Sequence, residues 1–187
     1  MLDLNTGELT ELIENNSYAG FVADDNLDVR LALRPNAEGG MDFFKVVDNA
    51  VEEEPFGSTG LEDSLTTNPA GFTTDGKTLY WLDSRGRNTA ALTAMDVETG
   101  ETRVIAENNQ ADIGGSIRDQ ETGEVEAYSV YYLKNEWVAL DPEIKASLDF
   151  LKANLTGEFG IGSRTEDDTK WIVGNDPVVG PAKSFLY

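Results

Sequence analysis

The chain has 187 residues, of which 40% are hydrophobic, enough to bury the core of one domain. With 35 acidic and 14 basic residues its formal net charge is −21, so nucleic acids and anionic membranes are not expected as partners. It has no cysteine and no histidine, which excludes disulfides, thiolate metal sites and a Ser-His-Asp triad formed by this chain alone.

Short apolar or alternating runs separated by turn signals follow one another along the chain, a pattern typical of antiparallel sheets. The segment "DLNTGELTELIEN" from Asp3 predicts a hairpin almost at the first residue, as if the chain were a piece of a larger protein. The runs "VRLALRP" from Val29, "MDFFKVV" from Met41 and "VEEEPF" from Val51 predict strands. Together with a strand near residues 18–23 they are expected to form one group.

A second group of strands begins with "GFTTDGKTLYWLD" from Gly71, in which Asp75-Gly76 is a strong hairpin signal. "TAALTAMD" from Thr89 and "TRVIAE" from Thr102 follow it. Further strands are predicted in the segments that start at Gly114, Val125 and Ser163, each beside a turn signal.

The tripeptide Thr-Gly-Glu closes three of these predicted hairpins, at residues 6–8, 99–101 and 122–124. Glycine adopts the left-handed conformation of such turns at little cost. The hairpin "DVETGETRVIAEN" from Asp96 also shares its first aspartate and its closing Glu-Asn with the hairpin from Asp3, 93 residues earlier. This self-similarity predicts a repeated structural unit.

One segment has helical spacing instead. In "DPEIKASLDFLKANL" the apolar residues Ile144, Leu148, Leu151 and Leu155 recur every three or four positions. Asp141 is suited to cap the helix, with Pro142 at its first position. We predict a helix over about 142–155, inserted among the strands.

Four strands in roughly 46 residues is the unit of a β-propeller blade, and the 93-residue offset then corresponds to two blades. Each of the two similar hairpins is then predicted to be the outer hairpin of a blade. We therefore predict an all-β fold of about four blades, with residues 1–187 forming a single partial or small propeller domain. Two arrangements stay open. The first strands could pair with the last and close a small ring, or the chain could be an arc of a larger ring whose open strand edges favour self-association.

Three segments resemble the propeller of prolyl-oligopeptidase-family serine peptidases, in the branch similar to acylaminoacyl-peptidases. They are "FTTDGKTLYWLDSRGRNTAAL", "ADIGGSIRDQETGEVEAYSVYYLKNEWVALD" and "FLKANLTGEFGIGSRTEDDTKWIVGND". The resemblance runs from about Val22 to Tyr187. It implies a propeller that precedes an α/β-hydrolase domain, covers its active site and restricts entry to short peptides.

The catalytic serine that the resemblance implies lies in a G-x-S-x-G motif of the hydrolase domain. Ser116 in "GGSIR" lacks the final glycine, and Ser58 in "FGSTG" has the wrong spacing. We therefore predict no catalytic residue, no cofactor and no metal in this chain. The implied partners are the α/β-hydrolase domain, which this chain lacks, and a peptide substrate.

Two acidic stretches are candidate sites. "DDNLD", Asp24 to Asp28, has the alternating oxygens of a calcium loop, but Val29 stands where the loop needs glycine and Pro35 where it needs a glutamate ligand. "EEE", Glu52 to Glu54, could attract a peptide amino terminus. We interpret the first as a solvated turn and the second as charges that protect a strand edge.

Among the polar candidates, Arg85 and Arg87 in "SRGR" are those that could contact a ligand or the other domain, because they follow a strand and so lie on a loop. A structural role, in which they pair with an acid of the next blade, is the interpretation we favour. Trp81, Trp137 and Trp171 are expected to pack between blades rather than line a binding face.

The leading hypothesis is thus a non-catalytic propeller region that gates or supports a prolyl-oligopeptidase-like peptidase. One alternative is a free-standing propeller that binds a peptide or protein. Another is a small propeller with a carboxylate-based hydrolase or lyase site, for which the 35 acids provide candidates but no positions in space.

Overall fold

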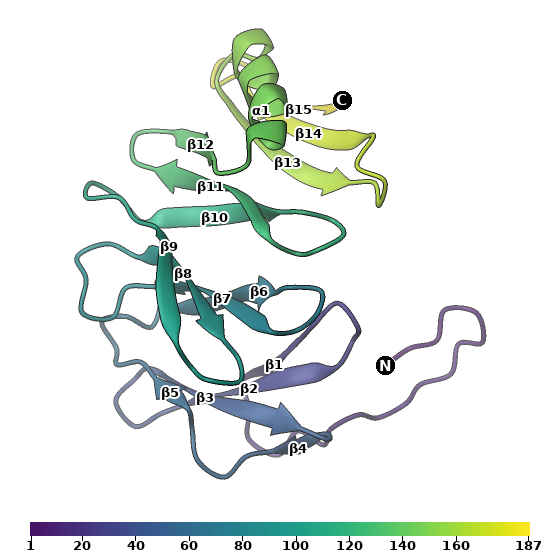
Figure 1. The fold of residues 1–187 in the computed structure, drawn as a ribbon, viewed down its shortest axis with the longest axis vertical. Coiled ribbons are helices and arrows are strands. Elements are labelled where there is room, and N and C mark those ends of the chain that lie inside the picture. The colour runs from purple at the N-terminus through teal and green to yellow at the C-terminus, as the bar shows by residue number, and fades with distance from the viewer.

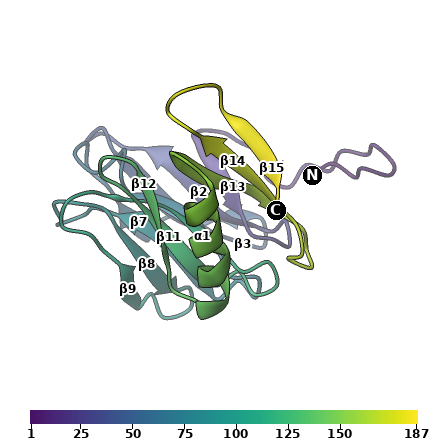
Figure 2. The same cartoon turned by 90° about the horizontal axis from the view of Figure 1, so that it is seen from above.

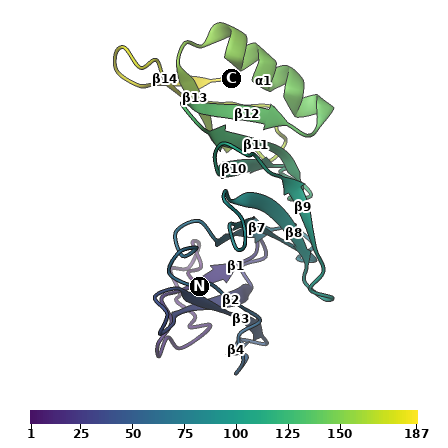
Figure 3. The same cartoon turned by 90° about the vertical axis from the view of Figure 1, so that its left-hand side faces the viewer.

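The computed structural model describes residues 1–187, which form four antiparallel sheets stacked along the long axis of the molecule (Figure 1). We call these sheets blades I to IV in chain order. Blades I and IV lie at opposite ends of the stack, and the turned view shows the same order (Figure 3). The sheets therefore form an open series, and the first strands do not pair with the last to close a small ring.

Blades I and II are the two larger sheets. Blade I comprises β1 (Gly20–Ala23), β2 (Val29–Pro35) and β3 (Met41–Val47), with β4 (Ala50–Val51) and β5 (Gly57–Ser58) both paired with β3. Blade II comprises β6 (Asn68–Phe72), β7 (Thr78–Asp83), β8 (Ala91–Asp96) and β9 (Thr102–Ala106).

Blades III and IV each have three strands. Blade III comprises β10 (Ile113–Arg118), β11 (Val125–Tyr131) and β12 (Asn135–Ala139), and blade IV comprises β13 (Glu158–Arg164), β14 (Trp171–Asp176) and β15 (Lys183–Leu186). The all-β propeller-like architecture predicted from the sequence is confirmed.

The register of the strands confirms the expected 46-residue period. The last residue of the first strand pairs with the first or second residue of the next strand in three successive blades: Phe72 with Leu79, Arg118 with Val125 and Arg164 with Trp171. Each of these pairs lies 46 residues after the one before it. Residues separated by 46 positions therefore occupy equivalent places in neighbouring blades.

The helix α1 (Pro142–Asn154) follows β12 and stands where blade II has its fourth strand. Asp141 caps it by accepting a hydrogen bond from the Glu143 amide at 2.6 Å. Ile144, Leu148 and Leu151 are buried in one cluster that also holds Ile117, Trp171 and Val173 of blades III and IV. Seen from above, α1 and β15 are nearest the viewer and the N-terminal arm projects to the side (Figure 2).

Apolar side chains between successive sheets form the core. Phe43 of blade I meets Trp81 of blade II edge to face, with ring centroids 4.8 Å apart. Tyr80 and Leu92 of blade II pack with Ile113 of blade III. Because each sheet is buried by its neighbours, the blades hold one another in place. No helix of the chain is long and apolar enough to cross a membrane.

Two expectations about strands were wrong. The strand predicted over "VEEEPF" is only β4, which ends at Val51. Asp48 and Asn49, with positive φ angles of 50° and 60°, form the turn between β3 and β4. Residues 52–56 are not a strand, although the Glu52 and Phe56 amides still donate to the Lys45 and Phe43 carbonyls of β3, both at 2.9 Å. The hairpin from Asp3 was expected to form the outer strands of a blade, but it makes a single bridge between Leu2 and Leu9 and extends away from the blades (Figure 1).

Candidate functional site

A cavity of about 430 Å³ lies between blades III and IV, where the inner strands β10 and β13 end. Most of the residues that line it are polar or charged, and Trp137 closes part of its wall. The lining residues used below are Ser116, Arg118 and Asp119 of blade III, Ser163 and Arg164 of blade IV, and Asp25 from the turn after β1.

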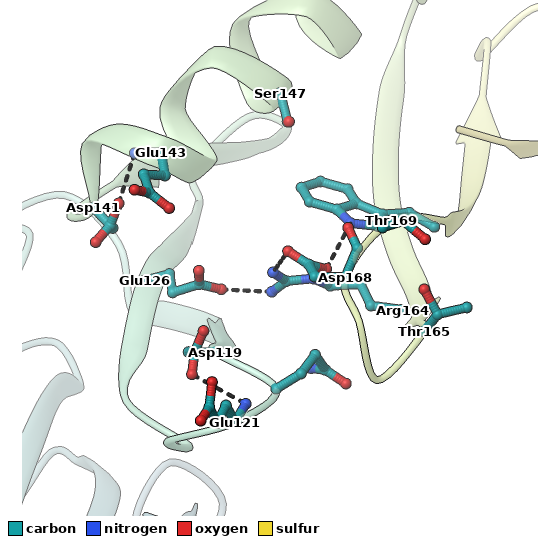
Figure 4. Close-up of polar contacts among 12 residues, drawn as sticks. Asp119, Glu121, Glu126, Asp141, Glu143, Ser147, Arg164, Thr165, Asp168 and Thr169 are labelled. Atoms are coloured by element: carbon teal, nitrogen blue, oxygen red, sulfur yellow. Dashed lines mark hydrogen bonds and ion pairs between the residues drawn. The ribbon is translucent and has the colours of Figure 1, made fainter.

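Arg164, the last residue of β13, pairs with one carboxylate of blade III and with one of its own blade IV (Figure 4). One of its terminal nitrogens donates to Glu126 Oε2 on β11 at 2.5 Å, and Nε donates to Asp168 Oδ1 at 2.5 Å. Its second terminal nitrogen pairs with the other oxygen of Asp168. The guanidinium lies over the ring of Trp171, 4.8 Å from its centroid, and Trp171 Nε1 donates to Asp168 at 2.8 Å.

The Arg164 side chain is only 3% exposed, so its charge requires these partners. Burial by itself would lower the pKa of Arg164, but hydrogen bonds to Asp168 and Glu126 outweigh it and raise this pKa above its ordinary value. The guanidinium therefore stays charged, and the network is a fixed ion pair between two blades.

Arg118 occupies the equivalent place one blade earlier. Its terminal nitrogen donates to the Phe72 carbonyl of blade II at 2.5 Å, just as Arg164 donates to the Arg118 carbonyl of blade III at 3.1 Å. Each arginine thus contacts the residue 46 positions before it. The Arg118 guanidinium lies flat on Gly71, whose φ is +109° and where a Cβ would come within 2.8 Å of it.

Arg118 differs from Arg164 in its electrostatic surroundings. No carboxylate lies within 4 Å of its half-buried guanidinium, whose bond to Phe72 is its one hydrogen bond. The neighbouring Asp119 is engaged in its own turn, where it accepts from the Thr122 amide and hydroxyl at 2.6 and 2.7 Å. These hydrogen bonds lower the pKa of Asp119.

The arginines selected from the sequence lie on the β7–β8 loop, at the other end of the strands from this cavity. Arg85 makes a two-point contact with Asp83, at 2.9 and 2.8 Å, and lies over Trp81. Arg87 donates to Glu107 at 2.7 Å. Both acids belong to blade II itself, whereas the structural interpretation expected a partner in the next blade.

The acidic stretches occupy separate places. Asp24 accepts from the Asn26 and Asp28 amides and from Arg30 at 2.7 Å, so it organises the β1–β2 turn. Glu52 to Glu54 are exposed after β4. No group of three or more acids in the chain is arranged to hold a metal ion.

The tryptophans and serines noted in the sequence lie in different surroundings. Trp81 and Trp171 are buried, whereas Trp137 is half-buried at the cavity and donates to the Phe159 carbonyl at 3.0 Å. Ser116 lines the cavity, while Ser58 donates to Asp42 on blade I. Arg118 and Arg164 were not among the candidates predicted from the sequence. Their spacing could have revealed them, because each comes directly before a turn and the two are separated by one blade period of 46 residues.

Comparisons with known proteins fit this architecture. No protein-family model matches the chain. Dipeptidyl aminopeptidase BIII of Pseudoxanthomonas mexicana is 42% identical over 187 residues, which is 100% of this chain and 27% of that protein. Dipeptidyl peptidase family member 6 of Caenorhabditis elegans is 24% identical over 191 residues, covering 97% of this chain and 26% of that protein.

The crystal structure of TolB from Acinetobacter baumannii superimposes with a TM-score of 0.53 at 15% identity, covering 83% of this chain and 37% of that one. The fold is thus that of a β-propeller arc. The chain corresponds to part of a dipeptidyl peptidase homologue and spans about a quarter of the length of these relatives. The resemblance to the propeller region of prolyl-oligopeptidase-family peptidases is confirmed.

Proposed function

We propose that residues 1–187 form one partial propeller domain that gates and supports the active site of a prolyl-oligopeptidase-like serine peptidase. The observation that carries this proposal is the 42% identity along the whole chain to about a quarter of a dipeptidyl aminopeptidase. Hydrolysis would belong to an α/β-hydrolase domain that this chain does not contain. The lack of histidine supports that division, because a Ser-His-Asp triad requires one.

The polar character of the cavity is consistent with a gate. Short peptides carry backbone amides and terminal charges, and an opening lined by arginine, serine and aspartate can exchange hydrogen bonds with them as they pass. The ion pair of Arg164 with Glu126 and Asp168 would keep the wall of such an opening rigid.

We further propose that Arg85 and Arg87 contact the hydrolase domain. Arg87 is the better candidate, because Glu107, its partner, is 61% exposed and the pair can be rearranged at little cost. Charge reversal by Arg87→Glu in the whole protein should weaken the association of the two domains while the propeller itself unfolds at the same denaturant concentration.

The proposed function is tested by hydrolysis assays. The purified chain should show no turnover of dipeptidyl or acylaminoacyl p-nitroanilides, whereas a protein that also contains the hydrolase domain should cleave one of them. Turnover by residues 1–187 alone, lost on mutating a pair of its acids, would overturn the proposal in favour of a carboxylate-based hydrolase.

A further inference from the structure

The internal repeat allows a position-by-position comparison of the two arginines that line the cavity. Arg164 is neutralised by Glu126 on β11 of the neighbouring blade and by Asp168 in the turn that follows β13. From the strand registers, Tyr80 and Thr122 stand at the places 46 residues before these two acids. Neither residue carries a negative charge that could neutralise Arg118.

Arg118 therefore presents a positive charge without a neutralising partner in a chain with 35 acids and 14 bases. The carbonyl of Phe72 and the backbone of Gly71 fix its guanidinium on one side. An arginine whose side chain is already held in place loses little conformational freedom when it binds an anion.

A carboxylate is the anion that matches this site. Guanidinium and carboxylate groups form charge-assisted hydrogen bonds that are often paired, and these are stronger in a partly buried site than in water. Asp25 and Asp119 line the same cavity, so a polyanion or a doubly charged phosphate would meet two negative groups as it entered. A single carboxylate adds only one negative charge opposite Arg118.

We propose that the cavity between blades III and IV binds a carboxylate group of a peptide through Arg118. The identity of the ligand as a peptide rests on the proposed function, whereas the carboxylate preference rests on the site alone. The carboxylate is that of an acidic side chain or of a free C-terminus. A volume of about 430 Å³ falls within the usual range of small-ligand sites, of roughly 300–1,000 Å³.

The test uses three capped dipeptides and the isolated chain. Ac-Ala-Asp-NH2 carries a side-chain carboxylate, Ac-Ala-Ala-OH a terminal carboxylate, and Ac-Ala-Ala-NH2 none. Each is titrated to about 5 mM at about 0.15 M salt, which screens the long-range repulsion from the net charge of −21. At least one carboxylate peptide should shift the Nε–Hε resonance of Arg118 saturably, and the neutral peptide should not; the better binder identifies the source of the carboxylate.

Two matched variants complete the experiment. Arg118→Gln should weaken binding about tenfold or more. Arg103→Gln should bind as the parent chain does, because Arg103 also has no carboxylate partner but is exposed on β9, away from the lining of the cavity. Equal binding of all three peptides, binding of none, or unchanged affinity in Arg118→Gln would overturn the proposal.

The titration of the unsubstituted chain tests the carboxylate site even if Arg118→Gln does not fold. Peptide binding is measured without hydrolysis. The titration can therefore contradict the carboxylate site while the hydrolysis assays support the proposed function, and the assays can contradict the proposed function while the titration supports the site.

Discussion

At the scale of single residues, two arginines placed one repeat apart perform different tasks. Each donates a hydrogen bond to a backbone carbonyl of the preceding blade, which ties successive sheets together. Arg164 is also paired with two carboxylates, and its charge serves only the fold. Arg118 has none, so its charge remains available to a ligand.

Replacing Arg164 should therefore destabilise the chain strongly. In Arg164→Gln, the carboxylate of Glu126, which is 13% exposed, loses its partner, and removing one member of a buried pair typically costs about 3 kcal/mol. The free energy of unfolding, measured in urea by tryptophan fluorescence, should fall by about that amount.

Arg87→Gln provides the control for this prediction. Arg87 pairs with the exposed Glu107, and such surface pairs contribute less than about 1 kcal/mol. If the two variants lost the same stability, the Arg164 network would have no special structural role.

Asp75 makes the stability of the chain depend on acidity. Hydrogen bonds from the Lys77 amide and the Thr73 hydroxyl lower the pKa of Asp75 from 3.8 to about 2. A lowered pKa means that the stabilisation is complete above the unfolded-state value of 3.8 and is lost as the pH falls through about 2.

Comparison with Asp75→Asn isolates this contribution, because both chains share the repulsion among the other acids. The parent chain should unfold at a higher temperature than the variant at pH 7. That difference should shrink between pH 3.8 and about 2. A difference that persisted unchanged at pH 2 would show that Asp75 acts through something other than its charge.

In the sequence, Arg85 and Arg87 are conspicuous because they are two bases on a predicted loop of an acidic chain. The structure pairs both with acids of their own blade. Arg118 and Arg164 are less conspicuous, because the repeat is visible in the sequence as similar hairpins and not as similar single positions. Which arginine lacks a carboxylate is a property of side chains on neighbouring strands, so it becomes visible only when the register of the strands is known.

At the scale of elements, each of the three Thr-Gly-Glu turns belongs to the same six-residue motif, which begins with aspartate. Asp3, Asp96 and Asp119 each accept hydrogen bonds from amides two and three residues later. Those hydrogen bonds are the main cause of the lowered pKa of each aspartate. The glycine of each turn has a φ between 71° and 76°.

These turns predict a graded response to Gly→Ala substitution. Gly100→Ala should cost about 1–2 kcal/mol, the cost of a left-handed alanine, because open space surrounds it. Gly123→Ala should cost about 3 kcal/mol or more, since a Cβ there would lie 2.8 Å from the Thr74 amide of blade II.

Gly7→Ala is the internal control, because the hairpin from Asp3 packs on no blade and its local strain is not transmitted to the core. Its effect on the urea midpoint should be negligible. An equal loss in Gly100→Ala and Gly123→Ala would contradict the close approach of blades II and III at this turn.

The elements themselves were largely predictable. Alternating runs such as Val29–Pro35 and Met41–Val47 became strands with those bounds, and the capped apolar periodicity after Asp141 became α1. The strand predicted over Val51–Phe56 ends at Val51, because the three glutamates that follow do not alternate with apolar residues that could be buried. The turn at Asp48 and Asn49 was not predicted, because positive φ angles usually occur at glycine and neither residue is one.

At the scale of the whole molecule, four sheets stack into an open series, and the outermost strand of the last one is unpaired on one edge. All four residues of β15 are exposed, and Leu186 is 68% exposed. Backbone groups on a free edge and apolar side chains beside them favour pairing with another strand. A further strand that hydrogen-bonded to β15 would cover this edge.

For the isolated chain, we expect self-association through β15. Light scattering coupled to size-exclusion chromatography should show a mass that rises with protein concentration, beyond that of a 20.4 kDa monomer. Leu186→Lys should suppress this rise, because a charge on the edge strand opposes pairing.

Leu65→Lys is the control. It removes an equally apolar residue, which is 89% exposed in a loop outside the sheets, and it should leave the association unchanged. If the chain is a monomer at all concentrations, the free edge of β15 does not cause self-association. If both variants suppress the rise in mass, exposed apolar side chains in general cause the association, and the edge of blade IV has no special role.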